Sequence, residues 1–248
     1  MIKTIGIIGG SGPLASMDIE KKVFDISRDR FLQSEDKNYP QLLIYQHTNF
    51  STNNFEREKQ YISCAKVLEN AGVNNILIAC HSDHIYFEKI KSEIKTEITS
   101  ILQLTSDYLH TIYPNTNKVG LLSTYVTLHS RLYHNALSKY NIEVIGPEEK
   151  LLAKLLEGIY LIKAGILHDK VIEECALENK YTYLFSSPID ELINKGCKHI
   201  ILGCTELPLI FCSLQALYPQ IILIEPNTII ARFIVEYFYP TNESQNLN

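Results

Sequence analysis

Val73-Asn-Asn-Ile-Leu-Ile-Ala-Cys80-His-Ser82 is an apolar run that ends in a cysteine and polar residues, and the chain repeats it as Cys197-Lys-His-Ile-Ile-Leu-Gly-Cys204-Thr-Glu206. A short apolar run bounded by polar residues is typical of a buried strand. The two stretches align at an offset of 124 residues, which makes Cys80 and Cys204 equivalent. The repeat predicts two similar units, each with a thiol at the carboxyl end of a strand.

The starts of these units match as well. Thr4-Ile-Gly-Ile-Ile-Gly-Gly-Ser-Gly-Pro-Leu-Ala-Ser16 aligns with Lys118-Val-Gly-Leu-Leu-Ser-Thr-Tyr-Val-Thr-Leu-His-Ser130 at an offset of 114 residues, which superimposes Gly6 on Gly120. Each stretch reads as a strand followed by a turn of small residues and a helix. Open α/β sheets bind their ligands at such carboxyl ends of strands, so we expect the functional site there.

Apolar runs alternate with segments of helical length along the chain, which is typical of parallel sheets covered by helices. We therefore predict an α/β protein with two pseudo-symmetric, Rossmann-like lobes and a cleft between them. One lobe is expected over 1–112 and 213–248, because the strand at 221–224 would return to it, and the other over 113–212. The expected strands are 2–8, 41–47, 74–80, 118–123, 142–146, 198–203 and 221–224, and the expected helices are 13–30, 55–71, 84–97, 126–140 and 147–163.

Composition argues against several functional classes. The 248 residues carry 23 Lys and Arg against 28 Asp and Glu, a net charge of −5, which disfavours a nucleic-acid partner. With 46% hydrophobic and 21% charged residues the composition is that of a globular protein. No apolar run approaches the roughly 18 residues of a membrane span, and the start lacks the pattern of an export signal. We therefore expect a cytoplasmic protein with no membrane partner.

The six cysteines are too irregularly spaced for a disulfide scaffold and form no CxxC pair. Cys80 and Cys204 each follow a strand and precede a helix, where backbone N–H groups and the helix dipole lower the pKa of a thiol. We therefore expect these two to be reactive. Packing, or for one of them the surface, is the simpler explanation for the other four, Cys64, Cys175, Cys197 and Cys212.

Two equivalent thiols across a cleft suit the inversion of a stereocentre. A base on one face of the carbon removes a proton, and an acid on the other face returns one. This scheme requires no metal, flavin or nicotinamide. A covalent hydrolase built on Cys80 with His81 or His84 and the Asp83 carboxylate would leave Cys204 unexplained, and Cys80-His-Ser-Asp-His84 is too compact for a closed zinc site.

Together, five motifs resemble the cofactor-independent aspartate/glutamate racemase family. They occur in the family's order between residue 4 and about residue 210, and Leu202-Gly-Cys-Thr-Glu-Leu207 is the most specific of them. The resemblance implies two pseudo-symmetric lobes, a substrate held between them, and two thiols that act without pyridoxal phosphate or another cofactor. The other motifs are Gly6-Ile-Ile-Gly-Gly-Ser-Gly-Pro-Leu-Ala-Ser16, Cys80-His-Ser-Asp-His84, Val119-Gly-Leu-Leu-Ser-Thr-Tyr-Val-Thr127 and Ile162-Lys-Ala-Gly165.

The resemblance implies a racemase that interconverts L- and D-aspartate or glutamate, with Cys80 and Cys204 as the catalytic thiols. Lys163 would pair with the side-chain carboxylate of the substrate, although a lysine near a helix end also complements the helix dipole. The expected partner is a small amino acid, the expected assembly is a homodimer, and no metal is expected. The residues expected to bind substrate are Gly10, Ser11, Ser82, Thr124, Thr127, Lys163 and Thr205, although the threonines are also suited to capping helices.

The chain departs from the family pattern at several positions. His81 and Ser82 stand where the family has Asn-Thr, and the family's Ile-Pro-Asp-Arg loop is replaced within 48–57 by Thr-Asn-Phe-Ser-Thr-Asn-Asn-Phe-Glu-Arg. The loop arginine is therefore missing or displaced to Arg57, with a protonated His81 as a further cation. Ser11 replaces Met and Val126 replaces Gly, which changes the wall of the cleft.

These departures keep alternatives open. A hydantoin or another small acid could be the substrate, and a catalytically silent ligand-binding protein on the same scaffold would explain the missing arginine. The start of the chain also resembles the phosphate-binding turn of nucleoside phosphorylases, but the remaining chain does not support that reading. The evidence for a nicotinamide site is weak, because the glycines do not match the Gly-x-Gly-x-x-Gly pattern and no acidic residue follows the second expected strand at the required distance.

Overall fold

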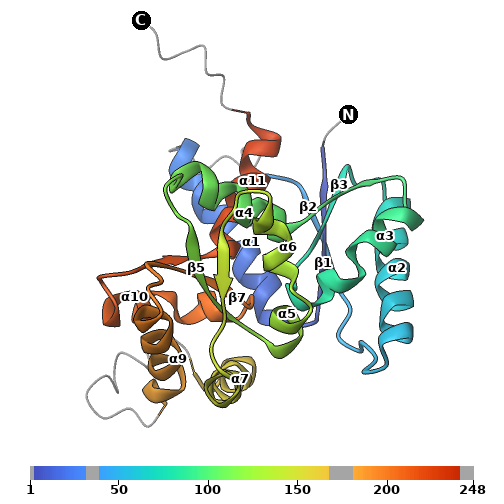
Figure 1. The fold of residues 1–248 in the computed structure, drawn as a ribbon. Helices are drawn as coiled ribbons and strands as arrows, with labels where there is room; N and C mark the ends of the chain where they lie inside the picture. The colour runs from blue at the N-terminus through green and yellow to red at the C-terminus, as the bar shows by residue number, and fades with distance from the viewer. Residues whose placement is uncertain (1–2, 32–38, 168–180, 241–248) are drawn as a thin grey trace, which may run out of the picture.

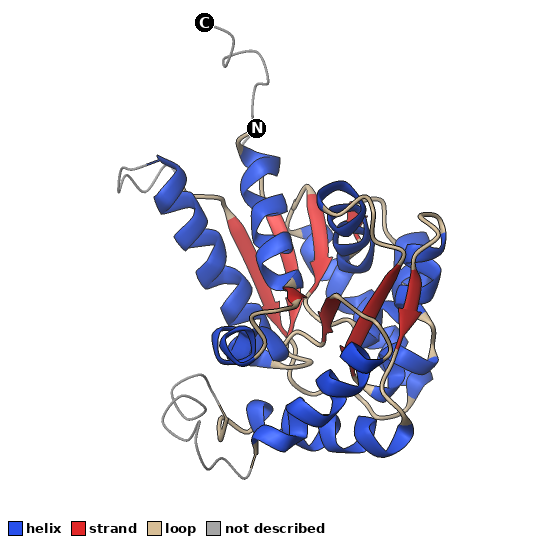
Figure 2. Cartoon of the chain, turned by 60° about the vertical axis from the view of Figure 1, so that its left-hand side comes forward, coloured by secondary structure: helices blue, strands red, loops and turns tan. Residues whose placement is uncertain are grey.

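The computed structural model describes residues 3–31, 39–167 and 181–240. It contains two four-stranded parallel sheets, which lie side by side with helices on their outer faces and between them (Figures 1 and 2). The α/β class and the two-lobe architecture are thus confirmed. Cys175 lies outside the described residues.

The first sheet has the strand order β2-β1-β3-β4, and every pair in it is parallel. Its strands are β1 (Ile5–Gly9), β2 (Leu42–Gln46), β3 (Asn75–Ile78) and β4 (Glu97–Thr99). The helices between and after them are α1 (Pro13–Phe31), α2 (Asn54–Asn70), the 3-10 helix η2 (Ser82–Tyr86), α3 (Phe87–Glu93) and α4 (Ile101–Ile112).

The second sheet repeats this order as β6-β5-β7-β8, again with parallel pairs. The repeat in the sequence therefore corresponds to a repeat of topology. Its strands are β5 (Lys118–Ser123), β6 (Glu143–Ile145), β7 (His199–Gly203) and β8 (Ile222–Ile224). The helices are α5 (Tyr125–His129), α6 (Leu132–Ser138), α7 (Glu149–Lys163), α9 (Thr182–Asn194), the 3-10 helix η3 (Leu207–Ile210), α10 (Phe211–Leu217) and α11 (Pro226–Phe238).

The strand expected at 221–224 does not return to the first lobe. In β8, Ile224 pairs with Ile201 of β7, so this strand closes the second sheet. Its counterpart β4, which begins at the last residue of the helix expected over 84–97, is not predicted, because a strand of three residues is too short to show a period of two. The prediction that 221–224 belongs with the first lobe is therefore wrong.

The helix expected over 126–140 is also divided. Arg131 adopts a left-handed backbone conformation with φ of 53°, and α5 ends before it while α6 begins after it. A non-glycine residue rarely adopts this conformation, and helical periodicity does not predict it. The break turns the chain between the two short helices.

The last helix of each unit packs against the other unit. Helix α11, which follows β8, lies on α1, and α4, which follows β4, lies on α6 and on α11 (Figure 1). Apolar residues of both sheets meet in the same core, including Ile7 of β1, Leu121 of β5 and Ile234 of α11. This reciprocal exchange fixes the two sheets relative to each other.

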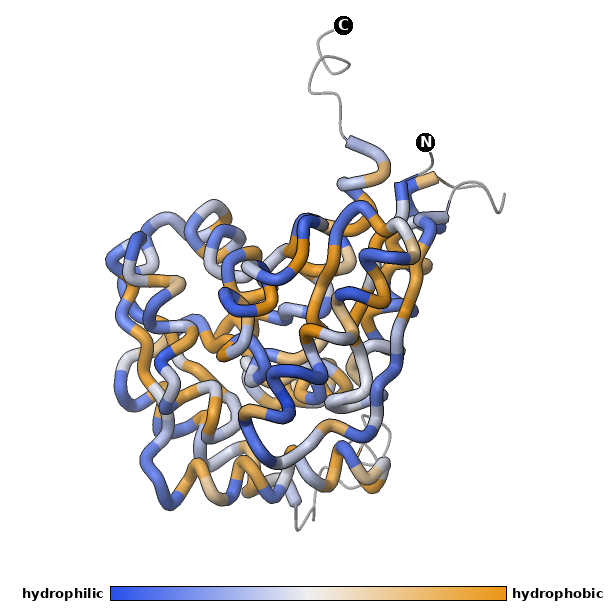
Figure 3. The backbone as a smooth tube through the Cα atoms, turned by 90° about the vertical axis from the view of Figure 1, so that its right-hand side faces the viewer, coloured by the Kyte–Doolittle hydropathy of each residue, from blue (hydrophilic) through white to orange (hydrophobic). Residues whose placement is uncertain are grey.

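The outer faces of the sheets have separate cores. Helices α2 and α3 cover the first sheet, and α7, α9 and α10 cover the second. Apolar residues concentrate along the inner strands, while the outer helices carry much of the polar surface (Figure 3). Within the described ranges, no helix is both long and apolar enough to cross a membrane.

The shared core generates a prediction about stability. Ile234→Ala should lower the free energy of unfolding by about 2–5 kcal/mol, because Ile234 is 0% exposed and its removal leaves a cavity between the lobes. Ile112→Ala is the matched control, since Ile112 is 51% exposed and should change stability by less than about 0.5 kcal/mol. Urea unfolding measures both, and equal effects would contradict a core shared by the lobes.

Candidate active site

The two cysteine loops meet across the lobes. Cys80 lies two residues beyond the end of β3, and Cys204 directly follows β7. The Thr205 hydroxyl, 2% exposed, donates to the Ala79 carbonyl oxygen at 3.4 Å. Each partner in this hydrogen bond is the chain neighbour of one cysteine, and neighbouring Cα atoms are about 3.8 Å apart. The carboxyl ends of β3 and β7 therefore bring the two thiol-bearing residues to one place.

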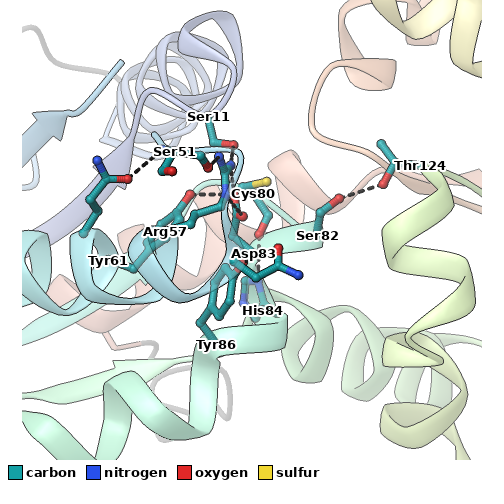
Figure 4. A network of polar contacts seen from close by, with 12 residues as sticks. Ser11, Ser51, Arg57, Tyr61, Cys80, Ser82, Asp83, His84, Tyr86 and Thr124 are labelled. Atoms are coloured by element: carbon teal, nitrogen blue, oxygen red, sulfur yellow. Dashed lines mark hydrogen bonds and ion pairs between the residues drawn. The ribbon is translucent and has the colours of Figure 1, made fainter. Parts of the chain in front are cut away.

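Asp83 is the buried carboxylate that acts on the pKa of the Cys80 thiol, and it is itself held by one cation and one hydroxyl donor (Figure 4). Arg57 donates from Nε to Oδ1 at 2.7 Å and from Nη2 to Oδ2 at 2.9 Å, and the Tyr61 hydroxyl donates to Oδ2 at 2.6 Å. Burial alone would raise the pKa of Asp83, but the hydrogen bonds and charge of Arg57, with those from Cys80 and Tyr61, lower it. Asp83 is therefore an anion in a buried ion pair.

Arg57 also connects the Cys80 loop to the turn after β1. Its Nη2 donates to the Ser11 hydroxyl at 2.6 Å, and its Nη1 donates to the Ser51 carbonyl oxygen at 3.3 Å (Figure 4). Burial opposes the charge of Arg57, but Asp83 outweighs it and raises the pKa of the guanidinium. The displaced arginine considered from the sequence thus reaches the cysteine loop, where it is paired with a carboxylate of the protein.

Glu206 takes the equivalent place beside the second thiol. Cys204 Sγ donates to Glu206 Oε2 at 2.9 Å, and Lys163 Nζ lies 3.6 Å from Oε1. Burial opposes the charge of Lys163, but Glu206 and the two cysteines raise the pKa of its ammonium. A second carboxylate and cation therefore repeat the arrangement around Asp83 in the other lobe.

Gly12 allows the turn after β1 to approach this carboxylate. Its φ is +142°, and a Cβ built there would lie 1.9 Å from Glu206 Oε1. A small cavity of about 170 Å³ opens beside it. The cavity is lined by Ser11, Gly12, Pro13, Leu14, Lys163 and Glu206.

Both thiols are protonated at neutral pH. Burial, followed by the charge of Asp83, raises the pKa of Cys80, and burial with the charge of Glu206 raises that of Cys204. Backbone N–H groups of Asp83 and Glu206 lower both values, as expected at the start of a helix, but they are outweighed. The expectation of lowered thiol pKa values is therefore wrong, because burial and the adjacent carboxylates dominate.

Three hydroxyls form a second bridge between the lobes. Ser82 Oγ lies 2.7 Å from Thr124 Oγ1 and 3.0 Å from Thr127 Oγ1 (Figure 4 shows the first pair). The Thr124 side chain also caps α5 by accepting from the Thr127 N–H at 3.4 Å. Three of the residues expected to bind substrate thus lie together where the two lobes meet.

Two other expected ligands have structural contacts. A Cβ at Gly10 would lie 2.3 Å from the His47 carbonyl oxygen, so Gly10 lets its turn pass over the end of β2. The Thr205 hydroxyl is engaged with Ala79, and its carbonyl accepts from Asn227 Nδ2 at 3.0 Å. Roles for Gly10 and Thr205 in substrate binding remain predictions.

The two histidines of the first cysteine motif are buried and neutral. Burial and the neighbouring His84 lower the pKa of His81 to about 3, and its Nδ1 lies 3.2 Å from the Tyr133 hydroxyl. His81 is therefore not the cation that the sequence left open. His84 has its pKa lowered to about 4 mainly by burial, and its two nitrogens contact the Cys80 carbonyl at 2.8 Å and the Ile101 N–H at 3.3 Å.

These contacts argue against a Cys-His nucleophile pair. Because Ile101 donates to Nε2, the proton of His84 is on Nδ1, and both nitrogens are engaged with backbone instead of a thiol. His84 ties the Cys80 loop to the first turn of α4. Asn227 does the same in the second unit, where it connects the Thr205 carbonyl to the first turn of α11.

The sequence motifs do not identify the carboxylates as partners of the thiols. Asp83 enters only the hydrolase alternative, and Glu206 only a family motif. An acidic residue two or three positions after each cysteine of the repeat was the available signal. Among the described residues, no group of three or more His, Cys, Asp or Glu side chains is arranged to hold a metal ion.

Comparison with known proteins establishes the family. The model of the Asp/Glu/hydantoin racemase family matches residues 8–234. The broad specificity amino-acid racemase RacX of Bacillus subtilis is 25% identical over 228 residues, which cover 88% of this chain and 91% of RacX. The chain therefore belongs to the Asp/Glu/hydantoin racemase family, as the sequence motifs indicated, and this membership supports an amino acid racemase.

Solved structures agree with this assignment. The structure of an aspartate racemase homologue from Pyrococcus horikoshii OT3 has a TM-score of 0.74 at 28% identity and covers 96% of this chain and 99% of its own. Glutamate racemase from Francisella tularensis in complex with D-glutamate has a TM-score of 0.68 at 20% identity over 96% of this chain and 81% of its own. This second, more distant likeness shows the fold alone.

Because two histidines are buried and neutral, we expect the protein to become less stable towards unfolding in acid. The folded pKa values of His84 and His81, about 4 and about 3, lie below the ordinary 6.5, so the unfolded chain binds protons more readily. The free energy of unfolding should therefore fall as the pH drops from about 6.5 towards 4, by up to about 1.4 kcal/mol per pH unit for each histidine. His84→Gln should reduce this slope in urea titrations, whereas His110→Gln at an exposed position should keep it.

Because Asp83 helps to raise the pKa of Cys80, its removal should change the reactivity of this thiol. Asp83→Asn removes the carboxylate that disfavours the thiolate and leaves Arg57 unpaired, so alkylation of Cys80 by iodoacetamide at pH 8 should accelerate about tenfold or more. Peptide mass spectrometry can follow this residue separately. Asp107→Asn, which removes a carboxylate paired with Lys139, is the control. An unchanged rate in Asp83→Asn would contradict the effect assigned to this carboxylate.

Proposed function

We propose that this protein is an amino acid racemase that works without pyridoxal phosphate, with Cys80 and Cys204 as its two acid–base groups. One observation carries the proposal: the two thiol loops meet across the lobes through Thr205 and Ala79. A buried carboxylate accompanies each thiol, with Glu206 accepting from Cys204 and Asp83 acting on the pKa of Cys80. A reaction that inverts one carbon needs an acid and a base on opposite faces of it. Two equivalent groups from pseudo-symmetric lobes supply both.

The carboxylates give the protonated thiols a way to become bases. When Cys204 loses its proton, Glu206 Oε2 at 2.9 Å accepts it, and the nearby ammonium of Lys163 stabilises the thiolate. Asp83 can accept the proton of Cys80 in the same way. Moving a proton from thiol to carboxylate transfers the negative charge to the sulfur, so the net charge beside Lys163 and Arg57 does not change.

The proton transfers balance without another reactant. A thiolate on one face removes the α-proton of the amino acid, and the electron pair of the C–H bond delocalises into the α-carboxylate. The thiol on the opposite face then donates its proton to the carbon, which leaves that sulfur as the thiolate. In the reverse direction the two cysteines exchange roles.

The substrate's α-carboxylate needs hydrogen-bond donors next to the thiols. The hydroxyls of Ser82, Thr124 and Thr127 are within 3.2 Å of one another between the lobes and are suited to this task. Ser11, which accepts from Arg57, lies in the wall of the neighbouring cavity. Aspartate and glutamate are the substrates implied by the resemblance, and the relatives extend to a broad specificity racemase, so the test must include both acidic and neutral amino acids.

Single-thiol variants test the two-base mechanism. Cys80→Ser and Cys204→Ser should abolish racemisation, because one face of the carbon then lacks its acid or base. Each variant should retain exchange of the α-proton for deuterium with one enantiomer only, and the enantiomer should differ between them. Proton NMR in deuterated water measures the exchange, and chiral chromatography measures the racemisation.

Cys212→Ser is the control, since Cys212 is exposed and follows the 3-10 helix η3. It should keep the activity of the unchanged protein. Retained racemisation in Cys80→Ser or Cys204→Ser would remove that cysteine from the mechanism. Loss of exchange with both enantiomers in both variants would indicate a covalent or single-base route.

A further inference from the structure

The proposed site contains two positive and two negative side chains, and they are already paired. Arg57 holds both oxygens of Asp83, and the ammonium of Lys163 lies 3.6 Å from Glu206. The two carboxylates are buried, with side chains 4% and 2% exposed. The charged groups of the site therefore sum to zero before any substrate enters.

The neighbouring ionisable groups do not add a positive charge. His81 and His84 are neutral, as described above. Behind Thr205, Asn227 donates to Asp18, whose other oxygen accepts from Lys22 at 2.5 Å, and Lys22 also lies 2.9 Å from Glu225. That cluster has two carboxylates for one ammonium. No unpaired cation is thus present in the described residues around the thiols to receive a further carboxylate.

An amino acid contributes charges that cancel, namely its α-ammonium and its α-carboxylate. A side-chain carboxylate adds one negative charge that must be paired when it leaves water. To pair it, Arg57 would have to release the two oxygens of Asp83, and this buried carboxylate would then lose its cation. Lys163 Nζ lies 3.6 Å from Glu206 without a hydrogen bond to Oε1, so its single charge would have to balance two carboxylates. Breaking a buried pair by removing one partner is strongly destabilising.

Glu206 further disfavours a substrate with a side-chain carboxylate. Its Oε1 is buried without a hydrogen-bond partner, although Lys163 is near, and it faces Gly12 at the cavity beside the thiol. An oxygen of a carboxylate can only accept hydrogen bonds. This atom repels a second carboxylate and suits an N–H or O–H donor.

Resting on the proposed function, we propose that the site selects amino acids with an uncharged side chain, and that the internal pairs Arg57 with Asp83 and Lys163 with Glu206 exclude aspartate and glutamate. The two cations hold the protein's own carboxylates where an acidic substrate would need them. Selectivity therefore follows from charge balance, with Asp83 as its main determinant because it occupies Arg57 through two hydrogen bonds.

Isosteric substrate pairs test the inference on the unchanged protein. L-Glutamine and L-glutamate have nearly the same shape and differ in charge, as do L-asparagine and L-aspartate. Exchange of the α-proton in deuterated water gives kcat/KM for each, and we expect the amides to exceed the acids by at least tenfold. An equal or higher kcat/KM for the acids overturns the inference and leaves the racemase proposal intact. No exchange with any of the four overturns the racemase proposal, and the inference with it.

A variant tests the cause of the selectivity. Asp83→Asn keeps the shape of the side chain but frees the charge of Arg57, so the ratio of kcat/KM for glutamate to that for glutamine should rise tenfold or more. The substitution also alters Cys80, but this changes kcat/KM for both substrates alike, because both react at the same thiols. The ratio of the two values therefore reports selectivity alone. Asp107→Asn, a carboxylate outside the site, should leave the ratio unchanged. If the glutamate-to-glutamine ratio of kcat/KM is unchanged in Asp83→Asn, Asp83 does not exclude acidic substrates. If the variant does not fold, the comparison of acids with amides on the unchanged protein still tests the selectivity.

Discussion

Two carboxylates, Asp83 and Glu206, are buried between the two lobes, and each needs a cation beside it to remain charged there. Asp83 is ionised because Arg57 and Tyr61 donate to it, and Glu206 is accompanied by Lys163. Burial, together with these carboxylates, raises the pKa of both thiols and keeps them protonated. In the mechanism and selectivity that we propose, the same two carboxylates govern both the acid–base chemistry of the thiols and the charge that the site accepts.

This charge arrangement depends on how the two sheets are held. Helix α11 lies on α1, and α4 lies on α6, so each unit contributes its final helix to the other unit's side of the core. The ends of β3 and β7 are thereby brought together, and Thr205 reaches the Ala79 carbonyl. His84 and Asn227 then anchor the two cysteine loops to the first turns of α4 and α11. The lobes and the loops are connected through the same pair of helices.

Much of the fold could be predicted from the sequence because its signals are local. The buried strands appear as apolar runs, and the repeat of Val73–Ser82 in 197–206 reveals two equivalent units. The misses have physical reasons. The strand β4 has three residues, too few for a period, and the break at Arg131 depends on a left-handed conformation that apolar periodicity does not report. Which sheet receives β8 is a matter of long-range pairing with β7.

By itself the sequence determined the α/β class, the two-unit repeat, the racemase family and the equivalence of Cys80 and Cys204, since these follow from order and spacing along the chain. Only the tertiary structure decided which charges meet. Arg57 pairs with Asp83, 26 residues away, and Lys163 with Glu206 in another segment, while His81 is enclosed and loses its charge. Burial and the pairing of distant side chains set these protonation states, and neither is a property of a motif.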